Sequence, residues 1–408
     1  MLTTGTRGLM LLAAWLGLAV ALAALPARAE DAKPGAVAIA TKFPGGNARV
    51  ERNDGASVHV APDARGDNPW FYWCFEATAS KPGRVTFVFP ETVVGAKNGA
   101  VSHQGPAVST DDGKTWRWMG TDTVKDNTFH YDFAKKDEKV RFAVAIPYLQ
   151  SDYDAFLAAN AENKHLKASA LTKSRNGRAV ELLQIGEPGP GKKAVLVTGR
   201  HHAAETIASH VLEGFLHAAM ADDAPGKAFR EQYVLYAVPF VDKDGVEEGD
   251  QGKNRKPHDH NRDYGEKSIY PEVQAIRDLD KAKNFELSLD FHCPLLVAED
   301  HQVMHFVGAK DHPVSNFDNV TELARGIKAR LPKDAPAGPL VWLKPADKPA
   351  PMNSHYFGFK KGMIMAATLE VPFAPKGKAT DPPSCRKYGR AILEAFVATR
   401  FLPADPKK

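Results

Sequence analysis

The sequence is poor in cysteine, with only Cys74, Cys293 and Cys385 among 408 residues. Three cysteines allow at most one disulfide, so a disulfide-based framework is excluded and stability must come from packing. Neither sign of charge dominates, because 53 basic side chains are balanced by 49 acidic ones. That balance excludes nucleic-acid binding as a general role. The sequence also lacks internal repeats and low-complexity tracts.

Only one long hydrophobic run is present, and it lies at the N-terminus. Arg7 precedes an almost uninterrupted apolar stretch at 9–25, and the small residues Ala27 and Ala29 follow on either side of Arg28. This order is typical of a secretory signal peptide. An uncleaved anchor is the alternative, because a run of about seventeen residues is near the lower limit for spanning a bilayer. We expect cleavage after residue 29 and a periplasmic or secreted protein without stable membrane association.

Length and composition predict two folded domains after the signal peptide at 1–29. Hydrophobic residues make up 43% of the chain and charged residues 25%, as in ordinary globular proteins. Aromatic and β-branched residues recur with period two, for example at 84–89, and predict an all-β antiparallel sandwich domain at 30–149. From 150 to 408, apolar runs of strand length alternate with helical spacing, which predicts an α/β sheet flanked by helices.

Two histidines and a glutamate follow predicted strands of the second domain. His202 and Glu205 come directly after the strand predicted at 194–198, and His292 follows the strand predicted at 285–291. If the strands are parallel, their carboxyl ends share one edge of the sheet, so the three side chains can meet there. Two histidines and one carboxylate are a ligand set for Zn²⁺ that leaves a position for water. The sequence therefore predicts one Zn²⁺ per chain and hydrolytic chemistry.

Hydrolysis at such a site also needs a base and a cation for the developing oxyanion. Glu370 follows the apolar strand predicted at 363–369, where a carboxylate without a role is costly. We interpret Glu370 as the base, with a solvated strand end as the alternative. Cations occur at 253–255 and again at 259–262, although runs of this composition are also typical of solvated loops.

Taken together, these motifs resemble the zinc metallocarboxypeptidases, in the branch similar to the cytosolic carboxypeptidases, which carry a β-sandwich ahead of the catalytic domain. The segment 200–209 matches the family's Arg-x-His-Pro-Gly-Glu-Thr-x-x-Ser except that Ala203 and Ala204 replace Pro-Gly. The segments 242–245 and 259–262 are similar to the family's Asn-Pro-Asp-Gly and Asp-x-Asn-Arg. The resemblance implies a mixed eight-stranded carboxypeptidase sheet flanked by helices and preceded by the sandwich.

The resemblance also implies roles for the matching residues. His202, Glu205 and His292 would bind zinc, and Asp259 would hydrogen-bond the far nitrogen of His202 and fix its tautomer. Glu370 would be the general base that takes a proton from a zinc-activated water and later passes it to the leaving amine.

Further roles concern the substrate. Asn261 and Arg262 would hold the terminal carboxylate of a peptide, a task suited to a bidentate guanidinium. Arg255 would stabilise the oxyanion, with Lys253 as its rival because the spacer from Arg255 to Asn261 is shorter than in the family. Tyr356 would close over the substrate, or it would be a packing tyrosine.

The sequence thus favours an exported zinc carboxypeptidase that acts on peptides with a free C-terminal carboxylate. A zinc-dependent deacylase or amidase acting on N-acyl amino acids stays open, because Asn261 and Arg262 would hold the carboxylate of either substrate. A non-catalytic exported protein that binds peptides or glycans is the third reading. The preferred terminal residue, the oligomeric state and the pairing of Cys74 with Cys385 do not follow from the sequence.

Overall fold

The structure is a computed structural model, in which Pro34–Lys408 form one compact unit. It describes residues 37–404 except for 68–69, 92, 97–99, 103, 297–301, 310–313, 339–340, 344–349, 376 and 379. The predicted signal peptide lies outside the described residues. No helix among those described has the length and hydrophobicity needed to cross a membrane. Cys74, Cys293 and Cys385 are buried and form no disulfide with one another.

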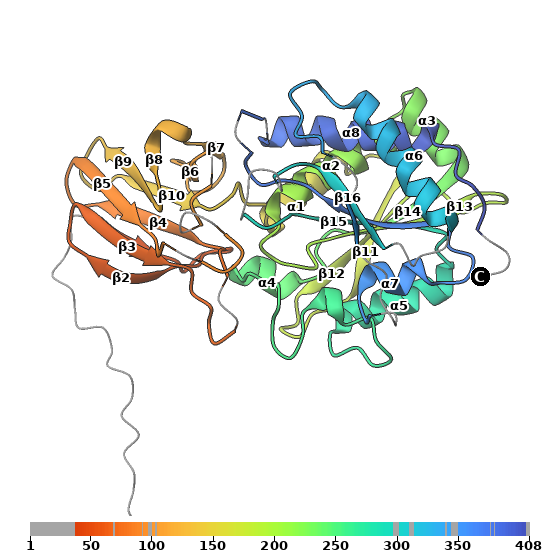
Figure 1. Cartoon of the computed structure of the whole chain (residues 1–408), viewed down its shortest axis with the longest axis horizontal. Coiled ribbons are helices and arrows are strands. Elements are labelled where there is room, and N and C mark those ends of the chain that lie inside the picture. Colours follow the sequence, from red (N-terminus) through yellow and green to blue (C-terminus); the bar gives the residue numbers. More distant parts are fainter. Residues whose placement is uncertain are drawn as a thin grey trace, which may run out of the picture. The chain divides into compact units, whose positions relative to one another are not determined.

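The N-terminal part is built from two five-stranded sheets, with strand orders β1-β4-β10-β6-β7 and β2-β3-β5-β9-β8 (Figure 1). The strands are β1 (Val37–Ala40), β2 (Arg49–Asn53), β3 (Ser57–Ala61), β4 (Cys74–Ala79), β5 (Gly83–Val88), β6 (Ala107–Ser109), β7 (Arg117–Trp118), β8 (Val124–Lys125), β9 (Thr128–Phe133) and β10 (Lys139–Ala143). All pairs are antiparallel except β3 with β5, which differs from the wholly antiparallel sandwich predicted. The chain visits the other sheet through β4 between these two strands, and such a crossover allows parallel pairing.

Aromatic rings from both sheets form the core between them. The ring centroids of Phe75 on β4 and Phe87 on β5 are 5.3 Å apart, and those of Phe129 on β9 and Phe142 on β10 are 5.2 Å apart. Trp73 stacks on Phe129 with centroids 5.9 Å apart. These are the period-two aromatic positions of the sequence, and each ring leaves water when the two sheets pack together.

The C-terminal part contains a mixed eight-stranded sheet of order β11-β12-β14-β13-β15-β18-β16-β17, which confirms the predicted sheet. Its strands are β11 (Leu166–Lys173), β12 (Ala179–Ile185), β13 (Lys193–Gly199), β14 (Tyr233–Val238), β15 (Leu287–His292), β16 (His305–Ala309), β17 (Val341–Leu343) and β18 (Met365–Glu370). The central strands β14, β13, β15 and β18 are parallel. Their carboxyl ends therefore share one edge, as the predicted metal site requires.

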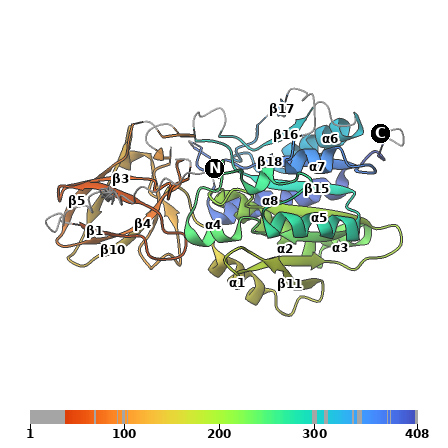
Figure 2. The same ribbon diagram turned by 90° about the horizontal axis from the view of Figure 1, so that it is seen from below.

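Helices cover both faces of this sheet (Figures 1 and 2). The helices are α1 (Gln150–Ala159), α2 (Thr206–Met220), α3 (Ala224–Gln232), α4 (Lys243–Glu248), α5 (Pro271–Lys283), α6 (Val314–Arg330), α7 (Asn353–Gly358) and α8 (Pro382–Ala398). Along β13, Val195 and Val197 pack into the same apolar cluster as residues of α2, α6 and α8, whereas Ala194 and Leu196 pack into the cluster that contains residues of α5 and α7. The strand is thus buried on both sides, which explains its continuous apolar run.

Helices α2 and α8 approach closely through two glycines. A Cβ on Gly214 would lie 2.2 Å from the carbonyl oxygen of Arg386, and one on Gly389 would lie 2.1 Å from that of Val211. Next to this contact, Arg386 Nε donates to Glu213 Oε1 at 2.6 Å. The two helices are therefore held by backbone packing and by one ion pair, in which Glu213 is buried and Arg386 is exposed.

The Glu213 ion pair should make stability depend on pH. Burial raises the pKa of Glu213, but hydrogen bonds from His217 and Arg386 outweigh it and lower that pKa from 4.5 to about 2. A lowered carboxylate pKa stabilises the fold above the unfolded value and loses this effect as the pH falls from 4.5 towards 2. We expect Glu213→Gln to reduce the free energy of unfolding by about 2 kcal/mol at pH 7. Urea unfolding at pH 7 and pH 3 should show this deficit shrinking; a deficit equal at both values would contradict the assignment.

Candidate active site

His202, Glu205 and His292 meet at the carboxyl edge of the sheet. His202 and Glu205 lie on the turn between β13 and α2, and His292 is the last residue of the neighbouring strand β15. His202 Nδ1 is 2.8 Å from Glu205 Oε1, and His292 Nδ1 is 2.7 Å from Glu205 Oε2. One candidate ligand atom from each residue lies within 4.8 Å of the other two. The structure thus brings the three predicted ligands together.

The chemistry of these donors fits Zn²⁺. Both histidines turn a ring nitrogen towards the carboxylate, and all three side chains are buried. Burial raises the pKa of Glu205, but His202 and His292 outweigh it and lower that pKa well below its ordinary value. The carboxylate is therefore ionised at neutral pH, the state in which it can bind a cation. Two imidazoles and one carboxylate match the ligand set of catalytic zinc sites.

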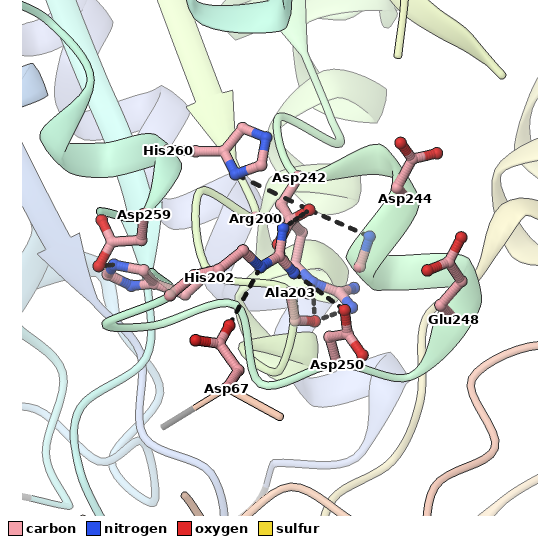
Figure 3. Close-up of polar contacts among 12 residues, drawn as sticks. Asp67, Arg200, His202, Ala203, Asp242, Asp244, Glu248, Asp250, Asp259 and His260 are labelled. Carbon is pink, nitrogen blue, oxygen red and sulfur yellow. Dashed lines mark hydrogen bonds and ion pairs between the residues drawn. The ribbon is translucent and has the colours of Figure 1, made fainter. Parts of the chain in front are cut away.

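Two further aspartates lie behind the histidines. Asp259 Oδ2 is 3.7 Å from His202 Nε2, near it but beyond hydrogen-bond distance, so the structure lacks the hydrogen bond expected from the resemblance; Figure 3 shows the two side chains next to each other. Asp290 Oδ2 is 2.7 Å from His292 Nε2. Burial alone would raise the pKa of each aspartate, but the neighbouring histidines outweigh it and lower both values. Asp290 holds the far nitrogen of His292 by a hydrogen bond and so directs its Nδ1 towards Glu205, whereas Asp259 only lies near the far nitrogen of His202.

Asp290 was missed by the sequence reasoning. Its Oδ1 accepts a hydrogen bond from Thr198 Oγ1 at 2.7 Å and lies 2.9 Å from His201 Nδ1. His201 Nε2 is in turn 2.8 Å from the hydroxyl of Tyr264. The signal was present in the sequence, because residues two apart on a strand project from the same face, as Asp290 and His292 do.

Removing the Asp290 charge should weaken zinc binding. Asp290→Asn keeps the size of the side chain but not the acceptor that orients His292, and such orienting carboxylates are worth about 10- to 100-fold in metal affinity. Competition with a fluorescent zinc chelator measures the change. Asp278→Asn on the exposed side of α5 is the matched control, and equal zinc affinity of the two variants would contradict the role of Asp290.

Glu370 lies at the same edge, one strand further along. It is the last residue of β18 and is paired in register with His292 on β15. Its Oε2 is buried and has no hydrogen-bond partner among the described residues. Burial is the main cause that raises the pKa of Glu370 above 4.5. Strand β16 pairs with β18 on the side away from β15 and places His305 opposite Glu370. His292, Glu370 and His305 therefore form a row across three strands. The neighbour His305 was not foreseen.

The two cations considered for the oxyanion occupy different places. Arg255 lies among three carboxylates, with Nη2 2.9 Å from Asp242 and 3.1 Å from Asp250 and Nε 3.7 Å from Asp67. Lys253 Nζ instead lies 3.8 Å from Glu205 Oε1. This placement differs from the role predicted for Arg255, because three acidic groups already bind its guanidinium. Lys253 is the cation that the structure places beside a metal-ligand candidate.

The predicted substrate-binding residues are only partly brought together. Arg262 follows Asp259 on one short turn, donates to Asp259 Oδ2 at 2.8 Å and keeps its side chain 40% exposed. Asn261 Oδ1 accepts the backbone N–H of Asn353 at 3.3 Å.

Tyr356 is engaged elsewhere. Its hydroxyl donates to Asp280 Oδ2 on α5 at 3.2 Å, and its ring lies 5.5 Å from that of Tyr264. This arrangement matches the alternative of a packing tyrosine rather than a side chain that closes over substrate.

Comparisons with known proteins identify the class. Residues 154–336 match the family of zinc carboxypeptidases, a range that includes His202, Glu205 and His292 but ends before Glu370. Residues 154–336 therefore belong to a zinc carboxypeptidase domain, of a family of hydrolases that uses Zn²⁺, and part of the chain is homologous to cytosolic carboxypeptidases. With a bacterial metallocarboxypeptidase the chain shares the fold.

Individual relatives agree with this. The chain is 27% identical over 223 residues to cytosolic carboxypeptidase 2 of Xenopus tropicalis, covering 51% of this chain and 22% of that protein. It is 24% identical over 371 residues to the uncharacterized protein ZMO1242 of Zymomonas mobilis, covering 86% and 93% of the two chains. The crystal structure of a metallo-carboxypeptidase from Burkholderia cenocepacia shares the fold, with a TM-score of 0.75, 21% identity and coverage of 89% and 98%. The chain thus spans about a fifth of the cytosolic relative.

Proposed function

We propose that this chain is an exported zinc-dependent carboxypeptidase that hydrolyses the C-terminal peptide bond of peptides. One observation carries the proposal: a single edge of the sheet holds the donor set of His202, Glu205 and His292 and, in register with His292, the buried carboxylate of Glu370. The zinc carboxypeptidase match and the names of the relatives support peptides as the substrate class.

The proposed chemistry divides between metal and base. Zinc held by His202, Glu205 and His292 would polarise the scissile carbonyl and lower the pKa of water at its open position. Glu370 would accept a proton from the attacking water and return it to the leaving amine. The burial that raises the pKa of Glu370 supports this assignment, because a raised pKa makes the carboxylate a stronger proton acceptor and moves its pKa towards neutral pH.

Lys253 would stabilise the negative charge that develops on the carbonyl oxygen. Its ammonium group lies 3.8 Å from Glu205 Oε1, and its side chain is only 19% exposed. A cation in such a sheltered position stabilises a developing oxyanion more than one in open water does. In this proposal Lys253 takes the role first predicted for Arg255.

Arg262 and Asn261 would hold the C-terminal carboxylate of the substrate. Asp259 binds one nitrogen of the Arg262 guanidinium and so limits its orientation, while the exposed remainder of the fork stays accessible. A planar guanidinium can bind a carboxylate through two parallel hydrogen bonds. Binding the terminal carboxylate next to the metal would restrict cleavage to the last peptide bond.

The activity is tested by pairing each peptide with its C-terminal amide. The purified protein is incubated with a peptide library in both forms, with and without 1,10-phenanthroline, and the products are read by mass spectrometry. We expect single residues to be removed from free-acid peptides only, and the chelator to stop the reaction. Internal cleavage would overturn the proposal, as would equal cleavage of the amides or turnover of N-acyl amino acids alone.

Export is proposed from the N-terminal sequence. The support is the order of Arg7, the apolar stretch at 9–25 and the small residues Ala27 and Ala29. Expression of the full chain in a Gram-negative host, followed by fractionation and N-terminal mass spectrometry, tests it. A periplasmic or secreted product that begins at Glu30 is expected, whereas an intact N-terminus on a cytoplasmic product would contradict export.

A further inference from the structure

The segment that carries Lys253 has no regular structure of its own. It runs from Gly249, after α4, to Lys256 and contains neither helix nor strand. We call residues 249–256 the lysine loop. Without internal secondary structure, the position of Lys253 depends on the bonds that this loop makes to other parts of the chain.

Gln251 forms hydrogen bonds with two separate parts of the chain. Its side-chain Oε1 accepts the backbone N–H groups of Phe71 at 3.1 Å and of Tyr72 at 2.8 Å. Its backbone carbonyl accepts the N–H of Ala204 at 3.1 Å. Ala204 lies between the metal-ligand candidates His202 and Glu205, so one residue joins the N-terminal β-sheet region to the turn that carries two of the ligands.

The environment of Gln251 makes this bond hard to replace. Phe71, Tyr72 and Ala204 are buried, with exposed fractions of 1%, 4% and 0%. The backbone N–H groups of Phe71 and Tyr72 share the single acceptor Gln251 Oε1. Leaving a partly buried N–H without a partner costs more stability than the hydrogen bond itself contributes.

Other contacts fasten the lysine loop to the same region. Asn47 Nδ2 donates to the carbonyl of Gly249 at 2.8 Å, Arg65 pairs with Asp250 at 3.0 Å, and the N–H of Lys256 donates to Asp67 Oδ1 at 2.9 Å. Both ends of the loop are thus held by residues 47–67, and Gln251 holds its middle.

The loop also presses against the turn that bears His202 and Glu205. Gly252 has φ of +77°, and a Cβ there would lie 2.4 Å from the backbone nitrogen of Ala203. The next residue, Lys253, places Nζ 5.9 Å from the ring centre of Trp70 and 3.8 Å from Glu205 Oε1. Trp70, Gln251 and Lys253 border one cavity of about 250 Å³. Small displacements of the loop would therefore move the Lys253 ammonium relative to the proposed reaction site.

We propose that Gln251 is a positioning residue that couples the N-terminal β-sheet region to catalysis by holding Lys253 beside Glu205. This inference rests on the proposed function and adds a role for the N-terminal region, which would serve as a support for the active site. Gln251 itself would not touch the reacting atoms.

Three variants test the coupling. Gln251→Leu removes the acceptor, Gln251→Glu keeps acceptor oxygens at the same position, and Gln232→Leu on the exposed end of α3 is the matched control. We expect Gln251→Leu to lower kcat about 10-fold or more with KM within about threefold and zinc content unchanged. Gln251→Glu should recover most of the lost kcat. Wild-type kcat for Gln251→Leu, or no recovery with Gln251→Glu, would overturn the proposal.

A double variant shows whether Gln251 acts through Lys253. If it does, adding Gln251→Leu to Lys253→Met should lower kcat little further, because the ammonium group that Gln251 positions is already absent. Fully additive losses would indicate a merely structural role and overturn the proposal.

Hydrogen–deuterium exchange gives a readout that does not need turnover. In Gln251→Leu the amides of Phe71 and Tyr72 should exchange about 10-fold faster than in the wild type, and that of Ala204 should also gain rate. If the wild type hydrolyses no peptide, the proposed function is wrong, but the exchange data still test whether Gln251 links the N-terminal region to the turn that carries Ala204. Unchanged exchange at all three amides would refute the link itself.

Discussion

Glu370→Gln is expected to lower kcat by about a thousandfold while zinc stays bound. The amide has the shape of the carboxylate but cannot take up a proton, and general-base groups contribute about 10²- to 10⁴-fold to rate. Zinc retention is expected because Glu370 lies beside the ligand His292 in register and is not one of the three ligand candidates.

The measurement combines peptide kinetics with metal analysis of the same sample. Glu322→Gln, on the exposed surface of α6, controls for the loss of a carboxylate elsewhere. A Glu370→Gln enzyme with near-normal kcat would remove Glu370 from the mechanism. Loss of zinc together with activity would instead make it a ligand.

Zinc removal should abolish activity and lower thermal stability together. The metal binds only where His202, Glu205 and His292 are assembled, so binding favours the folded state. With free zinc at about a thousand times its Kd, the stabilisation is about 4 kcal/mol. For a chain of this size that corresponds to about 5 °C in Tm.

Scanning calorimetry with and without added zinc measures this shift. Glu205→Gln removes one anionic ligand, so its Tm should respond little to zinc. A zinc-dependent shift of the same size in Glu205→Gln would place the metal elsewhere in the molecule.

The central strands of the C-terminal sheet could be predicted from the sequence. The strand predicted at 194–198 lies within β13 (Lys193–Gly199), because these residues are buried and all but Thr198 are apolar. Strand β11 was not predicted. Its residues are mostly exposed, and apolar and polar residues alternate only over 166–170, so its place is set by pairing with β12 and not by its own pattern.

The site was predictable where chemistry and strand ends coincide. Buried strands precede or end at the predicted residues His202, Glu205, His292 and Glu370. The parallel register of these strands brings the four residues to one edge of the sheet. Arg255 was not predictable in the same way. Its guanidinium is bound in part by Asp67, which lies 188 positions earlier in the chain, and no local pattern signals such a partner.

The row formed by His292, Glu370 and His305 limits how this site can change. The three residues come from adjacent strands and are paired in register. Neighbouring positions along a strand face opposite sides of the sheet. Inserting or deleting one residue within β18 ahead of Glu370 would turn its carboxylate away from the metal ligands, however well the protein still folded. New substrate preferences can therefore arise by altering loop lengths, while residue spacing inside these three strands has to be kept.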